Sequence, residues 1–460
     1  MNKKEKYDAV IIGFGKGGKT LAEALGAAGK KVALVERSPK MYGGTCINVG
    51  CIPTKSLIYS AGLVKKAAGS SKEAAEGYSA AMERKEKLVS ALREKNYQKL
   101  QQDPNVTVID GNAVFLSPNE ICVDTGEEQL TLSAEQFFIN TGSVPFIPPI
   151  KGLLGNPYVF FSEGLLEQKE LPKRLVIIGG GYIGVEFASM YAQFGSEVTI
   201  LQDGEIFLPR EDADIANAVR QHLGKMGVSV LTGIKIKEVL ALSGFAAVKA
   251  ETPEGEHSFE AEAVLVAAGR RPNTTSLGLY AAGVETDKRG GIVTDLHRRT
   301  TVPHIYAMGD AVGGLQFTYI SLDDFRIVKS AVLGDGSYTL ENRGAVPYSV
   351  FLDPPFSRVG MSEKEALDAG YRIKTAKLSA GMIPKARVLE QPDGLLKAVV
   401  DEETGRILGA HLFCAESHEM INLVKLAMDA RLPYTALRDM IFTHPTMSEA
   451  LNDLFAAFDR

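Results

Sequence analysis

Residues 7–37 read YDAVIIGFGKGGKTLAEALGAAGKKVALVER and decide the fold of the first part of the chain. A short apolar strand leads into Gly13, Gly15 and Gly18, and an apolar-periodic helix and a second apolar strand follow. The first glycine of such a turn permits the tight bend, the second lets a pyrophosphate approach, and the third allows close helix–strand packing. The helix N-terminus then offers unpaired N–H groups to the phosphates. The stretch therefore predicts a dinucleotide-binding strand–helix–strand unit.

The same pattern returns later in the chain. Residues 173–203 read KRLVIIGGGYIGVEFASMYAQFGSEVTILQD and align without a gap, at an offset of 166 residues, so that Gly179, Gly181 and Gly184 match the three earlier glycines. A single glycine-rich turn is a weak signal, because such turns are common. Two copies, each between a strand and a helix, predict two dinucleotide sites.

The two copies differ where the second strand ends. Glu36 closes the first copy and is placed to accept hydrogen bonds from adenosine ribose hydroxyls, whereas Gln202 stands at the matching position of the second. A glutamine neither repels nor neutralises a 2′-phosphate, and no arginine follows before Arg210. We therefore expect the second site to use both nicotinamide dinucleotides, with a slight preference for NADH.

Composition and length exclude several classes of protein. A chain of 460 residues with 45% apolar and 23% charged residues is typical of a globular protein of about three domains. The net charge of −5 does not indicate a nucleic-acid or membrane partner. No apolar run approaches the roughly 18–20 residues of a membrane helix, and the run at 9–12 is too short for a signal peptide. We predict a cytoplasmic location.

Cysteines are few, and two of them lie close together. The chain has four, which is too sparse for a disulfide scaffold, and Cys46 and Cys51 stand in the run GGTCINVGCIPTK at 43–55. Spacing alone leaves open a redox pair or two unremarkable thiols. No third and fourth ligand stands at zinc spacing, so we predict no metal site, and we assign no chemistry to Cys122 and Cys414. A dithiol beside a dinucleotide loop suits a two-electron thiol reductase.

This run resembles the active-site signature of the flavoprotein (pyridine nucleotide) disulfide reductases. Further segments resemble other marks of that family: Thr141-Gly142, AAGR at 267–270, YAMGD at 306–310 and HPTMSE at 444–449. The resemblance covers nearly the whole chain. It implies that the first repeat binds FAD, that the second binds NAD(P)H, and that the chain forms a homodimer whose active sites are shared across the interface.

The resemblance also implies a fold and a domain plan. The fold class is α/β, with two Rossmann-like three-layer dinucleotide-binding domains and a C-terminal α+β dimerisation domain. The expected domains are an FAD-binding domain with the dithiol at 1–150, an NAD(P)H-binding domain at 151–267, a second part of the FAD or central domain at 268–343, and a dimerisation domain at 344–460.

By the same resemblance, each catalytic residue has a role. Cys51 lies against the flavin as a thiolate, and Cys46 is the outer thiol that attacks the substrate. Because only a thiolate is nucleophilic, we expect the site to lower a thiol pKa from its usual value of ~8.5. Lys55 and Glu186 pair near the flavin N5, although either residue could instead be a solvated helix residue.

His444 is the expected acid/base residue, and the partner chain supplies it to each site. Glu449 either orients His444 or caps a helix, since Thr446-Met447-Ser448-Glu449 also fits a capping box; we favour orientation. The helix is predicted by apolar residues at helical spacing: Met447, Ala450, Leu451, Leu454, Phe455 and Phe458.

The resemblance assigns the cofactor contacts residue by residue. The expected FAD contacts are Gly13, Gly15, Gly18, Glu36, Gly44, Thr45, Thr141, Gly142, Asp310, Gln316, Phe317 and Thr318. The expected NAD(P)H contacts are Gly179, Gly181, Gly184, Gln202 and Gly269. The helix start that follows Asp310 is expected to face the flavin ring, where its dipole would stabilise negative charge.

Three segments point to a subgroup of the family. GGLQFTYISLDDFRIV, VPYSVFLDPPFSRVGM and IFTHPTMSEALNDLF closely resemble bacterial reactive-chlorine-resistance flavoproteins, which are similar to hypothiocyanous acid (HOSCN) reductases. The hypothesis is therefore NAD(P)H-dependent reduction of HOSCN to thiocyanate through a Cys46–Cys51 disulfide, as protection against oxidative stress. A dihydrolipoamide dehydrogenase and a Cu(II) reductase are alternatives, although Phe442 occupies the place where the former usually carry a second histidine. A flavin-bearing redox sensor with little turnover is an alternative of another class.

Overall fold

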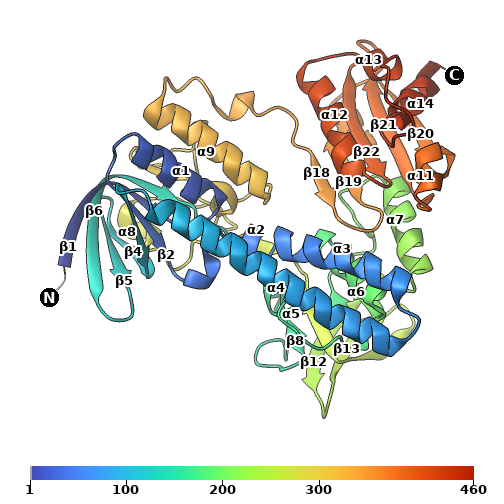
Figure 1. The fold of residues 1–460 in the computed structure, drawn as a ribbon, viewed down its shortest axis with the longest axis horizontal. Helices are drawn as coiled ribbons and strands as arrows, with labels where there is room; N and C mark the ends of the chain where they lie inside the picture. Colours follow the sequence, from blue (N-terminus) through green and yellow to red (C-terminus); the bar gives the residue numbers. More distant parts are fainter. Residues whose placement is uncertain (1–2, 460) are drawn as a thin grey trace. The chain divides into compact units, whose positions relative to one another are not determined.

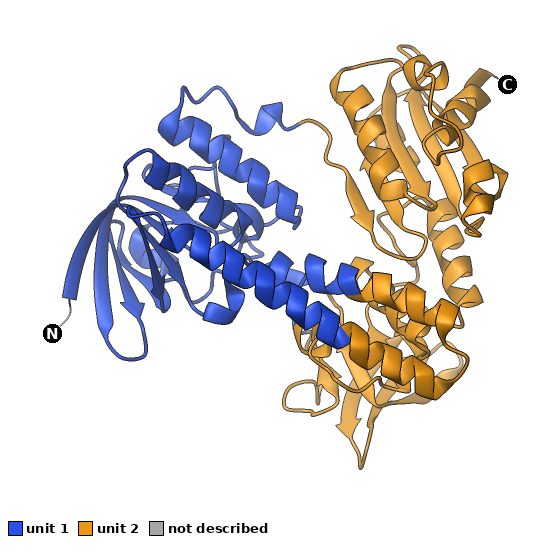
Figure 2. Ribbon diagram, viewed as in Figure 1, with its two compact units in different colours: residues 1–56, 82–147, 269–343 blue, residues 57–81, 148–268, 344–460 orange. Residues whose placement is uncertain are grey.

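The structure is a computed structural model that describes residues 3–459. Residues 1–2 of the predicted first domain and residue 460 of the predicted last domain lie outside the described residues. Contacts divide the chain into two units, shown in Figure 2: residues 1–56, 82–147 and 269–343 form unit 1, and residues 57–81, 148–268 and 344–460 form unit 2. The four domain boundaries given above stay predictions.

Unit 1 is built around a seven-stranded sheet. Its strand order is β3-β2-β1-β6-β5-β4, and β17 pairs with β6. The pairs among β1, β2, β3, β6 and β17 are parallel, and β4 and β5 join antiparallel. The strands are β1 (Lys3–Ile12), β2 (Val32–Glu36), β3 (Val106–Asp110), β4 (Asn112–Ser117), β5 (Glu120–Asp124), β6 (Gln129–Ile139) and β17 (Ile305–Ala307).

Both faces of this sheet are covered, because alternate residues of a strand point to opposite faces. Val10 and Ile12 of β1 are buried in one hydrophobic core, and Ala9 and Ile11 are buried in another. Helix α1 (Lys16–Ala27) joins β1 to β2 and packs beside α9 (Thr318–Leu333), as Figure 1 shows. The first predicted strand–helix–strand unit is confirmed.

Unit 2 contains the second repeat in a five-stranded parallel sheet of order β11-β10-β9-β15-β8. Helix α6 (Tyr182–Phe194) joins β9 to β10, which confirms the second strand–helix–strand unit. The strands of this sheet are β8 (Val159–Phe160), β9 (Arg174–Ile178), β10 (Glu197–Leu201), β11 (Ser229–Leu231) and β15 (Ala263–Val266). A three-stranded antiparallel sheet follows β11: β12 (Lys235–Ala241), β13 (Ala246–Thr252) and β14 (Gly255–Ala261).

The C-terminal part of unit 2 is an antiparallel sheet of order β18-β19-β22-β21-β20. Its strands are β18 (Tyr348–Val350), β19 (Phe356–Gly360), β20 (Ile373–Ser379), β21 (Leu395–Asp401) and β22 (Ile407–Phe413). Helices α12 (Ser417–Asp429) and α14 (Ala450–Ala456) contribute to its core, where Met447 and Leu451 are fully buried. The helix predicted from apolar spacing is confirmed, and the turn Ala457–Asp459 extends it.

The remaining elements connect these sheets. Two helices follow the first glycine loop and the dithiol run: α3 (Cys51–Ala67) and α4 (Ser71–Gln101). The shorter elements are α2 (Thr45–Asn48), α5 (Ser162–Leu165), α7 (Ala213–Lys225), α8 (Leu279–Ala282), α10 (Glu363–Asp368), α11 (Pro384–Val388), α13 (Thr435–Arg438), β7 (Ser143–Pro145), β16 (Arg270–Pro272) and the turn η2 (Gly309–Val312). Within residues 3–459, no helix combines the length and hydropathy that a membrane crossing requires.

Candidate active site

The first glycine-rich loop packs against the end of β6. Gly13 has a φ of 107°, and a Cβ there would lie 2.3 Å from the carbonyl oxygen of Asn140. A Cβ on Gly18 would lie 2.2 Å from the carbonyl oxygen of Gly13, so only glycine lets α1 approach β1 this closely. The Asn140 side chain fixes the loop, because its Oδ1 accepts from the Gly18 N–H at 2.8 Å and its Nδ2 donates to Met308 O at 3.0 Å.

The dithiol run touches this loop. A Cβ on Gly44 would lie 2.7 Å from the Cα of Gly15, so the two glycine backbones are in contact. Gly15 precedes α1 as its N-cap residue and supplies no side chain that could cap the helix. A bare helix start beside a close-packed glycine backbone fits a pyrophosphate, and it lies beside the segment that carries the cysteines.

The second glycine-rich loop repeats this geometry. Gly179 has a φ of 108°, and a Cβ there would lie 2.6 Å from the carbonyl oxygen of Ala267. A Cβ on Gly184 would lie 2.1 Å from Gly179 O, whereas a Cβ on Gly181 would meet no atom within 4 Å. The middle glycine therefore faces open space, which suits the approach of a phosphate. Gly269, also with a positive φ of 110°, lies just after the loop's contact with Ala267.

A shared contact relates the two strand ends. In the first copy, Glu36 Oε2 accepts from the Phe14 N–H at 3.0 Å. In the second copy, Gln202 Oε1 accepts from the Gly180 N–H at 2.8 Å. The donors are related by the same 166-residue offset as the acceptors. The glutamine therefore keeps the acceptor that holds the glycine loop and gives up only the negative charge.

The electrostatics of the two strand ends differ accordingly. Burial raises the pKa of Glu36, although the amides of Phe14 and Ser38 partly oppose this shift. Gln202 directs its Nε2 to Asp203 Oδ1 at 3.2 Å. The carboxylate next to the end of the second strand is therefore that of Asp203, the residue after Gln202. The expected use of both nicotinamide dinucleotides stays a prediction.

The turn after β6 carries several of the expected FAD contacts. Thr141 Oγ1 donates to Asn273 O at 2.8 Å, and Gly142 O accepts from the Asn273 N–H at 2.9 Å. Asp310 is half-buried in η2, where its Oδ2 accepts from Ser143 Oγ at 2.7 Å. Burial raises the pKa of Asp310. These residues therefore lie together at one end of the unit 1 sheet.

The two cysteines of the run meet at the junction of two helices. Cys46 lies in α2, Cys51 is the first residue of α3, and both are thiols in the structure. The Cys51 Sγ lies 3.6 Å from the Thr318 Oγ1 at the start of α9. Because α3 is 17 residues long and begins at Cys51, its dipole favours negative charge on that sulfur.

The titration of Cys46 departs from expectation. A hydrogen bond with Cys51 and burial raise the pKa of the Cys46 thiol well above its usual range, whereas Thr318 and the Lys55 cation lower it by less. The expectation of a lowered thiol pKa did not specify which cysteine, and for Cys46 the direction is the opposite. The reason is physical: a negative charge on one of two adjacent sulfurs disfavours a second charge on the other.

The start of α9 brings further predicted residues to the dithiol. Phe317 precedes the helix as its N-cap residue, and Gln316 lies before it. The ring of Phe317 stacks on that of Tyr319, with centroids 5.2 Å apart and planes at 9°. Burial and the charge of Cys51 raise the pKa of Tyr319. An aromatic pair thus lies close to the inner sulfur.

Lys55 and Glu186 lie in different units. Lys55 is half-buried on α3, one turn after Cys51. Glu186 is half-buried on α6, and its Oε1 accepts from the Phe351 N–H at 2.7 Å. Glu186 is therefore more than a solvated helix residue, and its predicted pairing with Lys55 stays a prediction.

His444 and Glu449 form a dyad. His444 Nδ1 and Glu449 Oε2 are 2.9 Å apart, and this hydrogen bond is the main cause of a lowered pKa at Glu449. Glu449 Oε1 also accepts from the Thr446 N–H at 3.1 Å, and Thr446 Oγ1 accepts from the Glu449 N–H at 3.3 Å. The carboxylate thus contacts the imidazole and closes the capping box at once. The His444 side chain is 71% exposed in the single chain.

Two polar residues that lie at the first glycine-rich loop were not identified from the sequence. Asn140 directly precedes Thr141, and no pattern distinguishes it from other loop asparagines. Lys19 is buried on α1, bonded through Nζ to Asn96, and burial lowers the pKa of Lys19 to about 8. Its position next to Gly18 in the first turn of the helix was the available signal.

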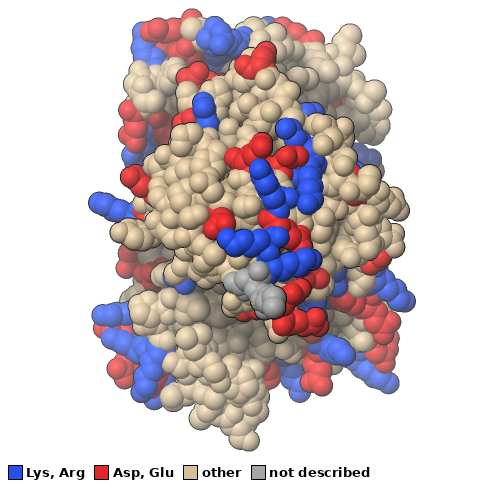
Figure 3. All heavy atoms as spheres, turned by 90° about the vertical axis from the view of Figure 1, so that its left-hand side faces the viewer, with Lys and Arg blue, Asp and Glu red and all other residues tan. Residues whose placement is uncertain are grey.

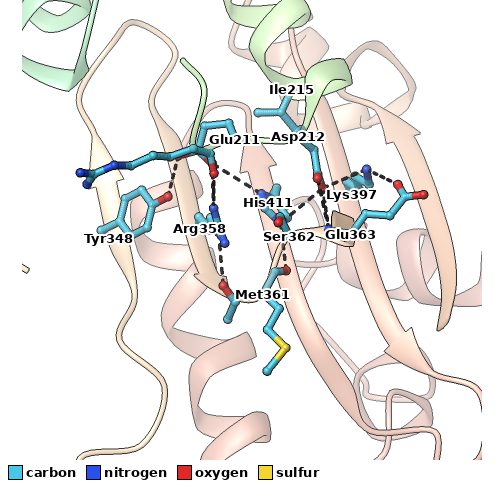
Figure 4. Close-up of polar contacts among 12 residues, drawn as sticks. Glu211, Asp212, Ile215, Tyr348, Arg358, Met361, Ser362, Glu363, Lys397 and His411 are labelled. Carbon is cyan, nitrogen blue, oxygen red and sulfur yellow. Dashed lines mark hydrogen bonds and ion pairs between the residues drawn. The ribbon is translucent and has the colours of Figure 1, made fainter. Parts of the chain in front are cut away.

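A buried polar cluster follows the second glycine loop within unit 2 (Figure 4). Glu211 Oε1 accepts from the hydroxyl of Tyr348 at 2.6 Å, and its Oε2 lies 3.5 Å from Arg358 Nη1 and 3.7 Å from His411 Nδ1. The same Oε1 accepts from the Tyr182 hydroxyl at 2.5 Å. Burial alone would raise the pKa of Glu211, but these partners outweigh it and hold the pKa below its usual value. Since Tyr182 is the first residue of α6, the cluster connects the second nucleotide loop with strands of the C-terminal sheet.

The neighbouring residue continues the cluster. Asp212 Oδ2 lies 2.9 Å from the ammonium of Lys397, which also contacts Glu363 at 2.8 Å and Asp214 at 3.1 Å. Lys397 is 1% exposed, so its charge is balanced inside the protein. Nothing in the sequence pattern indicated this arrangement.

The surface carries side chains of both charges. On the face shown in Figure 3, Lys and Arg side chains are interspersed with Asp and Glu side chains. Lys3 and Glu5 form an ion pair at 2.6 Å. A mixed surface gives no footprint for a polyanion. Among residues 3–459, no group of three or more His, Cys, Asp or Glu side chains is arranged to hold a metal ion.

Comparison with known proteins adds an independent finding. The model of the family "Pyridine nucleotide-disulphide oxidoreductase" matches residues 7–324, and that of its dimerisation domain matches residues 346–455. The Escherichia coli protein "Probable pyridine nucleotide-disulfide oxidoreductase RclA" is 49% identical over 98% of this chain and 99% of its own. A Staphylococcus aureus mercuric reductase is 33% identical over 100% of this chain and 84% of its own. The solved structure "Cu(II) complex of HOCl-induced flavoprotein disulfide reductase RclA from Escherichia coli" has 48% identity and a TM-score of 0.91, over 99% of both chains.

Proposed function

The chain belongs to the pyridine nucleotide-disulphide oxidoreductase family, and from that premise we propose that it reduces hypothiocyanous acid to thiocyanate with NAD(P)H. The family, the fold class, the enzymatic class and the cofactors FAD and NAD(P)H expected from the sequence are confirmed. The chain contains the family's dimerisation domain. The oxidant, the roles of the site residues, a shared active site and a cytoplasmic location are parts of the proposal.

One observation carries the proposal: Cys46 in α2 and Cys51 at the start of α3 are both thiols, and they stand in the run that contacts the first glycine loop. This pair lies where FAD is expected to bind. The first glycine loop and Glu36 would hold FAD, and the bound flavin would supply the electron pair that reduces this disulfide. The related Escherichia coli flavoprotein is HOCl-induced, which supports an oxidant produced under reactive-chlorine stress.

The proposed chemistry uses residues of this chain. The Cys46 thiolate attacks the electrophilic sulfur of HOSCN, a sulfur–sulfur bond forms, and hydroxide departs. The partner subunit's His444 acts as the acid and base that the high pKa of Cys46 calls for: it takes the thiol proton and returns it to the departing oxygen as water. Cys51 then attacks Cys46, releases thiocyanate and re-forms the disulfide. The sum is two thiols plus HOSCN giving one disulfide, thiocyanate, water and a proton.

Replacement of Cys46 tests this function. We expect Cys46→Ser to retain FAD, judged from its absorbance, and to lose thiocyanate production by roughly 100-fold or more, since no other thiol can take its place. Cys122→Ser, on β5, is the matched control and should stay within about twofold of the unchanged protein. Thiocyanate production by Cys46→Ser at the unchanged rate would contradict the mechanism. A panel of HOSCN, lipoamide, glutathione disulfide and Cu(II), ranked by kcat/KM, tests the oxidant separately.

Reduction of Cu(II) is the second candidate. The related flavoprotein forms a Cu(II) complex and is similar over 99% of both chains, and this observation supports the candidate. A dithiol that becomes a disulfide delivers two electrons and so reduces two Cu(II) ions to Cu(I). A Cu(II) rate above the HOSCN rate in the same panel would favour this candidate.

A further inference from the structure

Asn48 lies between the two cysteines and holds the segment that joins them. It is the last residue of α2, and its side chain is buried. Its Nδ2 donates to Tyr42 O at 3.0 Å and to Gly44 O at 2.9 Å, both on the N-terminal side of Cys46. The side chain therefore ties the segment after the first cysteine to the backbone before it.

Arg93 completes the hydrogen bonding of this amide. It lies on α4, and its Nε donates to Asn48 Oδ1 at 2.8 Å. Arginine only donates and backbone carbonyls only accept, so the two sides fix which end of the amide faces which partner. The amide thus uses both donors and its acceptor inside the protein, which is the condition under which a buried polar group rigidifies its surroundings.

The segment between the cysteines contains little regular structure. Helix α2 is a single turn of four residues, and Gly50 follows it before Cys51. Gly44, one of the two carbonyl partners of Asn48, contacts Gly15 of the first nucleotide loop. No carboxylate of the described residues lies within ion-pair distance of Arg93, so the guanidinium is not held by a competing charge.

We propose that Asn48 and Arg93 are positioning residues that hold Cys46 beside Cys51 and thereby raise the tendency of the pair to form its disulfide. Two thiols that are held close lose little conformational freedom when they form a disulfide. The intramolecular disulfide is therefore stabilised relative to mixed disulfides with glutathione. Arg93 acts only through Asn48. This inference rests on the redox role proposed above for the dithiol and not on the identity of the oxidant.

The test is the equilibrium of the FAD-loaded enzyme with glutathione. The dithiol plus glutathione disulfide gives the protein disulfide plus two glutathione thiols, and acid quenching with alkylation measures the oxidised fraction without air. We expect Asn48→Ala to lower this equilibrium constant about tenfold, which makes the reduction potential less negative by roughly 30 mV. Arg93→Met should lower it about threefold, and Arg93→Lys should restore part of the loss because the ammonium can still donate.

The double variant and a matched control separate positioning from general stability. If Arg93 acts through Asn48, adding Arg93→Met to Asn48→Ala should change the constant by less than about twofold. Lys95→Met removes an exposed cation from the same helix and should leave the constant unchanged. If the Arg93→Met variant folds and has the same equilibrium constant with glutathione as the Lys95→Met control, the proposal is overturned. This outcome holds even if Asn48→Ala fails to fold. A wild-type pair that forms no disulfide with glutathione would instead refute the proposed function.

Discussion

At the scale of single residues, the strand ends of the two repeats lead to a prediction about nicotinamide choice. Gln202 accepts from the Gly180 N–H as Glu36 accepts from the Phe14 N–H, so a glutamate at 202 would keep this contact. Its charge would repel a 2′-phosphate and favour the ribose hydroxyls. We expect Gln202→Glu to raise the ratio of kcat/KM for NADH over NADPH by about tenfold.

The measurement is the pair of kcat/KM values on the same preparation, which cancels errors in active-site concentration. Gln221→Glu adds the same charge at an exposed position of α7 and is the matched control. A ratio that moves equally in both variants would mean that Gln202 does not face the adenosine ribose.

The sequence identified those residues whose role depends on neighbours close by in the chain. The glycines of both loops follow from one motif, because the turn and the close packing depend on neighbours a few residues away. Asn48 and Asn140 could not be found in this way. Their partners Arg93 and Met308 lie far along the chain, and an asparagine carries no mark of what it will face.

At the scale of elements, the buried cluster around Glu211 predicts how stability depends on pH. The pKa of this carboxylate is held below its usual value of 4.5, so its contribution is fully present above that pH. The contribution is lost as the pH falls through the lower folded-state value, because protonation costs more in the native state. We expect the thermal midpoint of the unchanged protein to fall on acidification below about pH 4.5.

The variant Glu211→Gln isolates this effect. At pH 7 it removes one of the two carboxylates that contact the buried Arg358, Glu365 being the other, and we expect a loss of about 1–3 kcal/mol in stability. The difference from the unchanged protein should shrink as the pH falls below 4.5, and it should be lost below the lower folded-state pKa, where both native chains carry a neutral group. Glu256→Gln, exposed on β14, should match the unchanged protein at every pH. A pH-independent loss would show that the charge of Glu211 is not what stabilises the cluster.

Element prediction was accurate where periodicity is local. Both strand–helix–strand units and the helix after Glu449 follow from apolar spacing over a dozen residues or so. The order of strands in the C-terminal sheet does not follow from spacing. Strand β19 pairs with β22 across about fifty intervening residues, and those residues include β20 and β21, which pair with each other. The Glu211 cluster depends on that order, since Arg358 and His411 are neighbours only through the pairing of β19 with β22.

At the scale of the whole molecule, the proposed role of His444 leads to a prediction about which chain supplies it to each dithiol. The His444 side chain is 71% exposed in the single chain, and the dimerisation domain that carries it spans residues 346–455. An exposed dyad on such a domain fits a group that serves the dithiol of a second chain. This arrangement predicts that defects in Cys46 and His444 complement each other between chains.

A mixed dimer distinguishes the two arrangements. A dimer of one Cys46→Ser chain and one His444→Ala chain has, if the sites are shared, one site with both defects and one site with an intact dithiol and an intact histidine. We expect this dimer, purified with two different affinity tags, to show about half the activity of the unchanged dimer, while each single-variant homodimer shows a few per cent or less. If each chain used its own histidine, both sites of the mixed dimer would carry one defect, and its activity would be the mean of the two homodimers. Thiocyanate formation by the three dimers at equal FAD content decides between these outcomes.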